Sequence, residues 1–268
     1  MNINYKEECK DYELMLNLDN YQKKELNDSY DYICEYLLNI NIPFIPSKNI
    51  NYGNLQELFT KSIKKLSINT QLFYKDIIKE IQIIKTNMFE NGYAQIIGNS
   101  KIQKIYITKK HLQEIDFACY SHELGHVPYL RNGARKDYYE YSEVLPIFLE
   151  YLSWLSINED NAFNNFIKVR FQSIKLEAEE FLKASKQDYY ENEYHHNYLD
   201  YLKRDYLKYI LSFDYVLNLI NVYKEDNDYV VKLIDSIVCG YSTFKEEENI
   251  LGIDSKCKKL IDESKKYI

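Results

Sequence analysis

Residues 121–130 read SHELGHVPYL, and within them His122, Glu123 and His126 form the pattern HExxH. On an α-helix, residues four apart lie on one face, one turn apart, so the imidazoles of His122 and His126 can converge on a single ion. Zinc accepts imidazole nitrogens at about 2.0–2.1 Å. Glu123 is rotated by about 100° around the helix, which suits a general base that lies beside the metal without binding it. The pattern therefore predicts a helical zinc site.

Histidine is rare in this chain, and its rarity makes the pattern informative. Only five of the 268 residues are histidine, and at that frequency HExxH arises by chance in roughly one chain in a hundred. The alternative is an ordinary pair of surface or capped histidines. Gly125 presents no side chain on the turn between the two histidines, so another helix can approach the site closely.

Composition and charge exclude several classes of protein. The formal net charge is −7 with no basic block, which argues against a nucleic-acid surface. Charged residues make up 28% and the mean hydropathy is −0.50, as in soluble globular proteins. The sequence contains no run of 18 apolar residues and begins without an apolar signal segment, so we expect neither a membrane span nor a signal peptide. Five scattered cysteines without CxxC spacing predict free thiols in a reducing cytoplasm.

Most of the chain has the apolar periodicity of helices, and its 7 glycines and 4 prolines provide few breaks. The HExxH helix should end near Val127, because Pro128 cannot continue it. A capping box is predicted at Thr243 and Glu246. The other predicted helices cover 5–39, a start at Asn54, Thr70 to about Asn91, 138–156, 160–186, 191–223, 228–239, 243–250 and 256–267.

The residues between Gly92 and Thr108 differ from the rest of the chain. YAQIIG (93–98) and KIQKIYIT (101–108) are short, rich in β-branched residues and joined through Gly98-Asn99-Ser100, which predicts a β-hairpin. This hairpin leads into the HExxH helix. We therefore expect one mainly α domain over residues 1–268, with a small β-hairpin edge next to that helix.

A catalytic zinc takes three protein ligands and keeps a fourth position open. The candidates for the third ligand are Glu140, Glu143 and Glu150. Glu143 and Glu150 are seven residues apart and share a face in a very apolar stretch, where a carboxylate needs a partner such as a metal. Glu143 lies 17 residues beyond His126, which allows a loop and an antiparallel return, and Pro146 should loosen the helix just past it. Glu150 can instead orient a ligand histidine.

HELGH followed by EVLPIFLE (143–150) resembles the oligopeptidase family of zinc metallopeptidases, which includes thimet oligopeptidase and oligoendopeptidase F. In that family the third ligand is the first Glu of a Glu-x(6)-Glu pattern, which implies Glu143. The stretch from LKYILSFDYVLNLI to Gly252-Ile253-Asp254 is similar to the family's closing helices. The resemblance covers roughly residues 90 to 255, and it implies a gluzincin-type zincin with a catalytic core at 91–255 behind N-terminal helices at 1–90.

The family also carries a histidine and two tyrosines that stabilise the oxyanion and bind the substrate backbone. The matching region is EYHHNYLDYLKRDYLKY (193–209). The resemblance implies these roles for His196, Tyr206 and Tyr209. Because tyrosine is so common here, at 28 residues, and the spacing is not a clean match, three alternatives stay open: His195, Tyr198 and Tyr201. Family members are commonly much longer, and often carry another histidine where this chain has Pro128 and Tyr129.

These residues and the resemblance predict a cytoplasmic zinc endopeptidase that acts on short unstructured peptides. One zinc per chain would be held by His122, His126 and Glu143, and Glu123 would take a proton from a zinc-activated water and pass it to the leaving amine. The hairpin edge, 93–97 or 102–108, would take the peptide as an added strand. The alternative is a non-catalytic peptide-binding or immunity-type module that retains the scaffold. The sequence leaves the oligomeric state and the substrate preference open.

Overall fold

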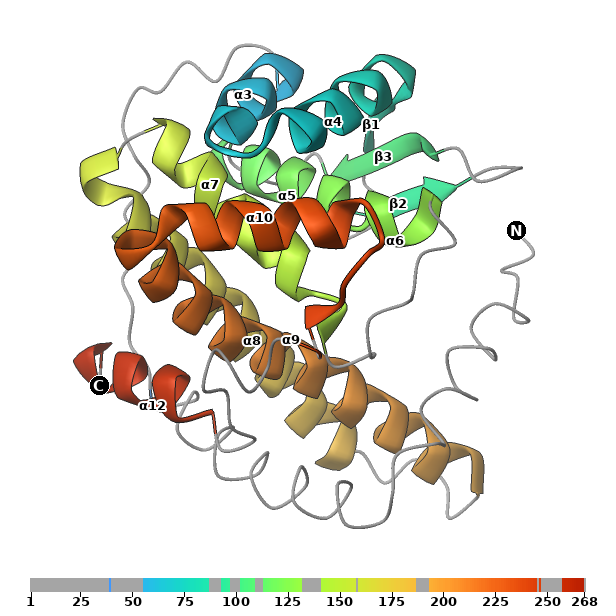
Figure 1. Ribbon diagram of the computed structural model, residues 1–268. Coiled ribbons are helices and arrows are strands. Elements are labelled where there is room, and N and C mark those ends of the chain that lie inside the picture. The colour runs from blue at the N-terminus through green and yellow to red at the C-terminus, as the bar shows by residue number, and fades with distance from the viewer. Residues whose placement is uncertain are drawn as a thin grey trace.

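The computed structural model describes residues 39, 55–86, 93–96, 102–108, 113–131, 141–157, 159–186, 193–244, 246 and 257–267 (Figure 1). Its α-helices are α3 (Leu55–Ser62), α4 (Ile68–Glu80), α5 (Gln113–Gly125), α6 (Val127–Arg131), α7 (Val144–Ile157), α8 (Ala162–Lys186), α9 (Glu193–Glu225), α10 (Asn227–Val238) and α12 (Lys258–Ser264). Short 3-10 segments cover Ile63–Lys65, Glu159–Asn161 and Lys265–Tyr267. The prediction of a mainly α fold with a small β edge beside the HExxH helix is confirmed. The helices predicted within 5–39 lie outside the described residues.

The β edge is a three-stranded sheet in the order β1-β3-β2, formed by β1 (Gln82–Thr86), β2 (Tyr93–Ile96) and β3 (Ile102–Thr108). β2 and β3 pair antiparallel, as predicted for the hairpin, while β1 pairs parallel to β3 with Gln82 opposite Lys104. The prediction that the helix from Thr70 continues to Asn91 is wrong. α4 ends at Glu80, because the following residues, rich in β-branched isoleucine, pair from Gln82 onward with β3.

The sheet order also corrects the predicted docking of a peptide on either strand of the hairpin. β3 is the central strand and its two sides are taken by β1 and β2, so 102–108 presents no open edge for an added strand. Among the described strands, β2 keeps one side unpaired. Its residues 93–96 are therefore the part of the predicted docking edge that stays available.

Helix α7 is the centre of the packing. It lies against α5 and α3, and against α8 and α9 (Figure 1). All of its residues from Val144 to Trp154 are buried, because the stretch is apolar around the whole helix rather than along one stripe. This burial explains why a carboxylate on α7, or just before it, must have a partner close by.

Two prolines lie at helix starts rather than at breaks. α5 ends at Gly125, two residues before the predicted end, and Pro128 lies in the first turn of α6. The prediction that Pro146 loosens its helix is wrong, because Pro146 lies in the first turn of α7. Backbone N–H groups in a first turn have no intrahelical acceptor, so a proline there removes no helix hydrogen bond.

The predicted capping box is confirmed. The Thr243 N–H donates to Glu246 Oε2 at 3.0 Å, and the Glu246 N–H donates to Thr243 Oγ1 at 3.4 Å.

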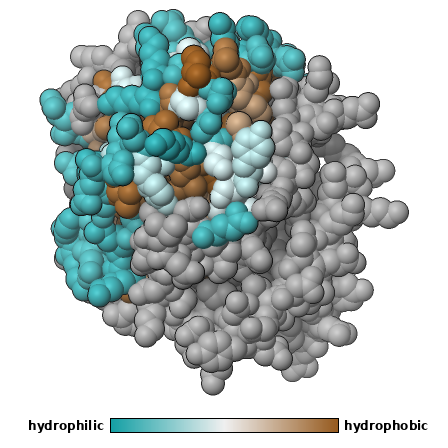
Figure 2. Space-filling model, viewed as in Figure 1, coloured by the Kyte–Doolittle hydropathy of each residue, from teal (hydrophilic) through white to brown (hydrophobic). Residues whose placement is uncertain are grey.

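On the face in Figure 2, hydrophobic side chains gather near the top, over the region of α3 and α4, within a largely hydrophilic surround. The described residues include three exposed large hydrophobics: Ile68, Leu72 and Tyr241. None of the described helices combines the length and the apolar character that crossing a membrane requires.

Candidate metal centre

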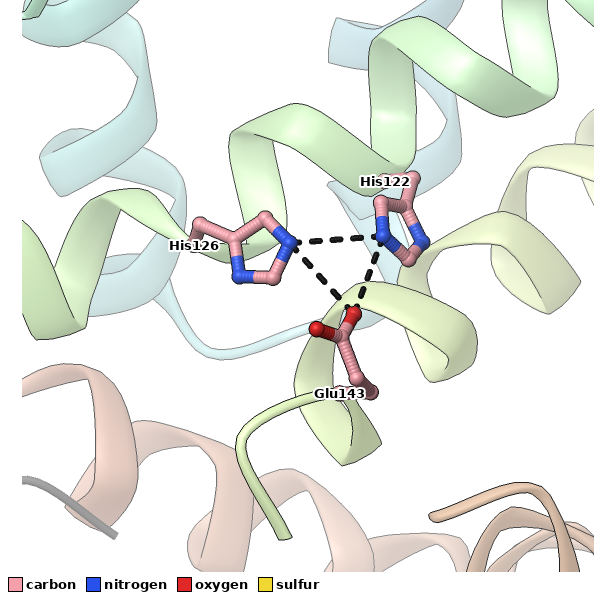
Figure 3. Close-up of side chains that lie close together, drawn as sticks. All are labelled: His122, His126 and Glu143. Atoms are coloured by element: carbon pink, nitrogen blue, oxygen red, sulfur yellow. Dashed lines mark hydrogen bonds and ion pairs between the residues drawn. The ribbon is translucent and has the colours of Figure 1, made fainter. Parts of the chain in front are cut away.

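The candidate metal centre lies where the end of α5 meets the start of α7 (Figure 3). His122 projects from the last turn of α5, and His126 immediately follows the end of that helix. Glu143 immediately precedes α7, and its carbonyl accepts the Ile147 N–H at 3.0 Å, which begins that helix. The structure brings together the three residues predicted as ligands. It places Glu150 outside this group, against the other ring nitrogen of His122.

The three donor atoms form a nearly equilateral triangle. Glu143 Oε2 lies 3.1 Å from His122 Nε2 and 3.4 Å from His126 Nε2, and the two imidazole nitrogens are 3.3 Å apart (Figure 3). Ligands of a tetrahedral zinc at 2.0–2.1 Å stand about 3.3–3.4 Å apart. Glu143 Oε2 is also buried without a hydrogen-bond partner among the described residues. The donor set and its spacing therefore fit a zinc ion, and His122, His126 and Glu143 could hold a metal.

The pKa shifts of the three residues favour the protonation states that bind a metal. Burial lowers the pKa of His122 to about 4 and also lowers the pKa of His126. Burial alone would raise the pKa of Glu143, but the nearby charges of His126 and Lys208 hold it well below its ordinary value. The His126 charge acts only while that imidazole is protonated, whereas the Lys208 ammonium stays beside Glu143 at neutral pH. At neutral pH the site therefore offers two neutral imidazoles and one carboxylate, the forms that bind metals.

Glu150 fixes the orientation of His122 from the side opposite the donor triangle. Its Oε1 lies 2.6 Å from His122 Nδ1, and its side chain is fully buried. Nδ1 therefore carries the proton and donates to Glu150, which leaves Nε2 free to face the other donors. Of the two uses that the sequence left open for Glu150, this geometry fits the orientation of a histidine.

Arg170 completes this arrangement, and sequence reasoning did not find it. From α8, its Nε donates to Glu150 Oε2 at 2.7 Å, and its terminal NH2 group contacts Glu150 Oε1. The buried Glu150 charge is thereby paired, as a buried carboxylate requires. The apolar surroundings of Glu150 predict a partner of some kind, but no motif marks a residue 20 positions along the chain.

Lys208 is the second residue that sequence reasoning missed. It projects from α9, and its Nζ lies 3.2 Å from Glu143 Oε1, the carboxylate oxygen that is not part of the donor triangle. Its side chain is 14% exposed, and its Nζ also lies 4.9 Å from the ring centre of Tyr209. Each of the two buried carboxylates therefore has a cationic side chain as its ion-pair partner: Lys208 for Glu143 and Arg170 for Glu150.

The structure describes the side chains of only some of the predicted catalytic residues. Glu123 is buried, at 7% exposure, on α5 next to His122. Tyr209 is half-buried on α9. His196 and Tyr206 lie on the same helix, but their side chains are outside the described part of the structure, as are those of the alternatives His195, Tyr198 and Tyr201. Glu140 also lies outside it. The catalytic roles of Glu123, His196, Tyr206 and Tyr209 stay predictions.

Comparison with known proteins supports the fold. A Bacillus anthracis protein assigned as an oligoendopeptidase F superposes with a TM-score of 0.60 over 92% of this chain, at 12% identity. A second structure assigned as an oligoendopeptidase F gives 0.59 over 90%, also at 12% identity. This chain covers 55% and 56% of those two chains. At such identity the likeness is one of fold. No known family model matches the sequence, and no curated protein does.

Proposed function

We propose that this chain is a zinc-dependent endopeptidase that hydrolyses short unstructured peptides. The observation that supports it most is the triangle of donor atoms from His122, His126 and Glu143, with edges of 3.1–3.4 Å. The shared fold with two proteins assigned as oligoendopeptidase F agrees with it. One zinc per chain would be held by these three residues.

A bound zinc would polarise the scissile carbonyl and lower the pKa of water toward about 7. Glu123, one residue from His122 on α5, would accept a proton from the attacking water and later give it to the leaving amine. Glu150 and Arg170 hold the His122 ring in place during this exchange. His196, Tyr206 and Tyr209 are proposed to hold the substrate and the negative charge that develops on the carbonyl oxygen.

The peptide would add as a strand beside β2. Main-chain hydrogen bonds to an open edge tolerate many side chains, which suits unstructured substrates of varied sequence. We place the reaction in the cytoplasm, because the five cysteines are scattered along the sequence without CxxC spacing, a pattern typical of proteins in a reducing compartment.

The test is a comparison of Glu123→Gln with the wild-type protein. The variant should keep about one zinc per chain and lose cleavage of a broad library of unstructured peptides, read by mass spectrometry. Removing the metal with a chelator should abolish wild-type cleavage, and added zinc should restore it. Glu57→Gln, an exposed change on α3, serves as the matched control and should cleave normally.

The outcomes separate the proposal from the alternative. A wild-type protein that holds zinc but cuts nothing in the library would favour the non-catalytic peptide-binding module. Full activity of the Glu123→Gln variant would contradict the assigned general base.

A further inference from the structure

The two oxygens of the Glu143 carboxylate face different partners. Oε2 lies 3.1 and 3.4 Å from the two imidazole nitrogens, while Oε1 lies 3.2 Å from Lys208 Nζ. The carboxylate is 3% exposed, so water does not replace either partner easily. The cation and the two imidazoles therefore contact different oxygens of one carboxylate.

The side chain of Lys208 is largely buried where it contacts Glu143. Lys208 comes from α9, more than 60 positions along the chain from Glu143, and its side chain is 14% exposed. Burying an ammonium group is costly unless it is paired, and Glu143 Oε1 supplies that pair. The contact therefore also restrains the Glu143 carboxylate.

We propose that Lys208 is a positioning residue that restricts Glu143 to binding the metal through Oε2 alone. A carboxylate can bind a metal through one oxygen or through both, and the second mode takes up another coordination position. With Oε1 held by the Lys208 ammonium, that mode is blocked and the position stays open for the reacting groups. This inference deepens the proposed function and rests on it for the presence of the metal.

Because Lys208 is positively charged, the proposal predicts the direction in which metal affinity changes when this residue is replaced. An ammonium group beside a ligand carboxylate repels a divalent cation and weakens the carboxylate as a donor. Replacing it with a neutral side chain should tighten metal binding, whereas a lysine that only supports the local structure would, when replaced, loosen the site and weaken binding.

Cobalt(II), which substitutes for zinc and absorbs visible light, provides the test. Four-coordinate cobalt absorbs strongly and five-coordinate cobalt weakly, so the spectrum reports how Glu143 binds without any need for cleavage. Lys208→Met should show a clear loss of intensity, together with zinc affinity raised roughly tenfold, since the repulsion is removed. Lys208→Arg, which keeps a cationic donor, should retain the wild-type spectrum. Lys224→Met, a change at an exposed lysine on the same helix, is the control.

A Lys208→Met spectrum as intense as that of the wild type would overturn the proposal, whatever the affinity. Circular dichroism checks folding, and Lys208→Leu replaces Lys208→Met if the latter fails to fold. The proposed function fails separately, on the wild-type protein, if that protein takes up no cobalt or zinc or cuts no peptide.

Discussion

Gly125, the last residue of α5, lies directly against the backbone of Pro146 in the first turn of α7. A Cβ built on Gly125 would stand 2.3 Å from Pro146 Cα and 2.6 Å from Pro146 N. No side chain fits in that space, so glycine is required for this approach of the two helices. Because Gly125 lies between the histidines and Pro146 follows Glu143 closely, this contact sets the distance between the two histidines at the end of α5 and Glu143 just before α7.

Gly125→Ala should therefore damage the metal site through the backbone. The added methyl group must push α7 away from α5, which costs about 2–3 kcal/mol as overpacking of a core. The Glu143 carboxylate would move with α7, so zinc affinity should fall along with the free energy of unfolding. Chelator competition and urea unfolding measure the two effects.

A second variant tests whether the clash is with the backbone. The shortest distances from the built Cβ are to Pro146 Cα and N, atoms that Pro146→Ala retains. The double variant Gly125→Ala/Pro146→Ala should bind zinc as poorly as Gly125→Ala alone. Rescue of zinc binding in the double variant would show that the proline ring, and not the chain itself, limits the approach.

The pair formed by Glu150 and Arg170 should act on metal affinity through His122. Arg170→Met leaves the fully buried Glu150 carboxylate without its charge partner, so that Glu150 holds the His122 ring less firmly. Loss of such an outer partner typically costs 10–100-fold in metal affinity, and we expect Arg170→Met to fall within about this range. Zinc titration against a competing chelator measures it, and unchanged affinity would contradict the orienting role.

The parts of the site that the sequence predicts are those governed by local helix geometry. His122 and His126 are one turn apart, and Glu143 and Glu150 stand out because they are carboxylates in an apolar stretch. Arg170 and Lys208 come from α8 and α9 and belong to no motif, so only the tertiary packing brings them to the carboxylates. The sequence predicts helix at β1 for a similar reason, since the partner strand β3 begins about twenty residues later in the chain.

The N-terminus of α4 provides a test of pH dependence away from the site. Asp235 of α10 accepts hydrogen bonds from Thr70 Oγ1 at 3.0 Å, from Asn69 Nδ2 at 3.3 Å and from Ser67 Oγ. Partial burial opposes the effect, yet the hydrogen bonds from Ser67, Asn69 and Thr70 lower the pKa of Asp235 below its ordinary value of 3.8. The ionised carboxylate thus ties α10 to the start of α4.

A carboxyl group with a lowered pKa stabilises the folded state above its unfolded pKa and loses that contribution as pH falls through its folded pKa. Asp235→Asn should therefore be less stable than the wild type at pH 6, by about 1 kcal/mol as for a charge-assisted hydrogen bond. The difference should shrink as pH falls below 3.8. Urea unfolding at several pH values measures it, and a gap that stays constant with pH would rule out this role.

Helix α12 depends on a carboxylate from another helix. Asp214, buried on α9, accepts the Leu260 N–H at 2.7 Å in the first turn of α12, whose own N-cap residue, Cys257, makes no side-chain capping bond. Asp214→Ala should expose α12 to amide hydrogen exchange and cost roughly 2 kcal/mol, as for a lost cap with a buried donor left unpaired. Asp228→Ala, on the exposed first turn of α10, should leave α12 protected, and equal protection in both variants would contradict the capping role.

A zinc ion held between α5 and α7 is central to the proposed function. Equilibrium dialysis with zinc, followed by elemental analysis of wild-type protein and Glu143→Ala, tests this most directly. We predict one zinc per wild-type chain and a large loss of zinc from Glu143→Ala, with the helical content of the two proteins equal by circular dichroism. A wild-type protein that binds no zinc, or a Glu143→Ala variant that binds it as tightly as the wild type, would contradict the account.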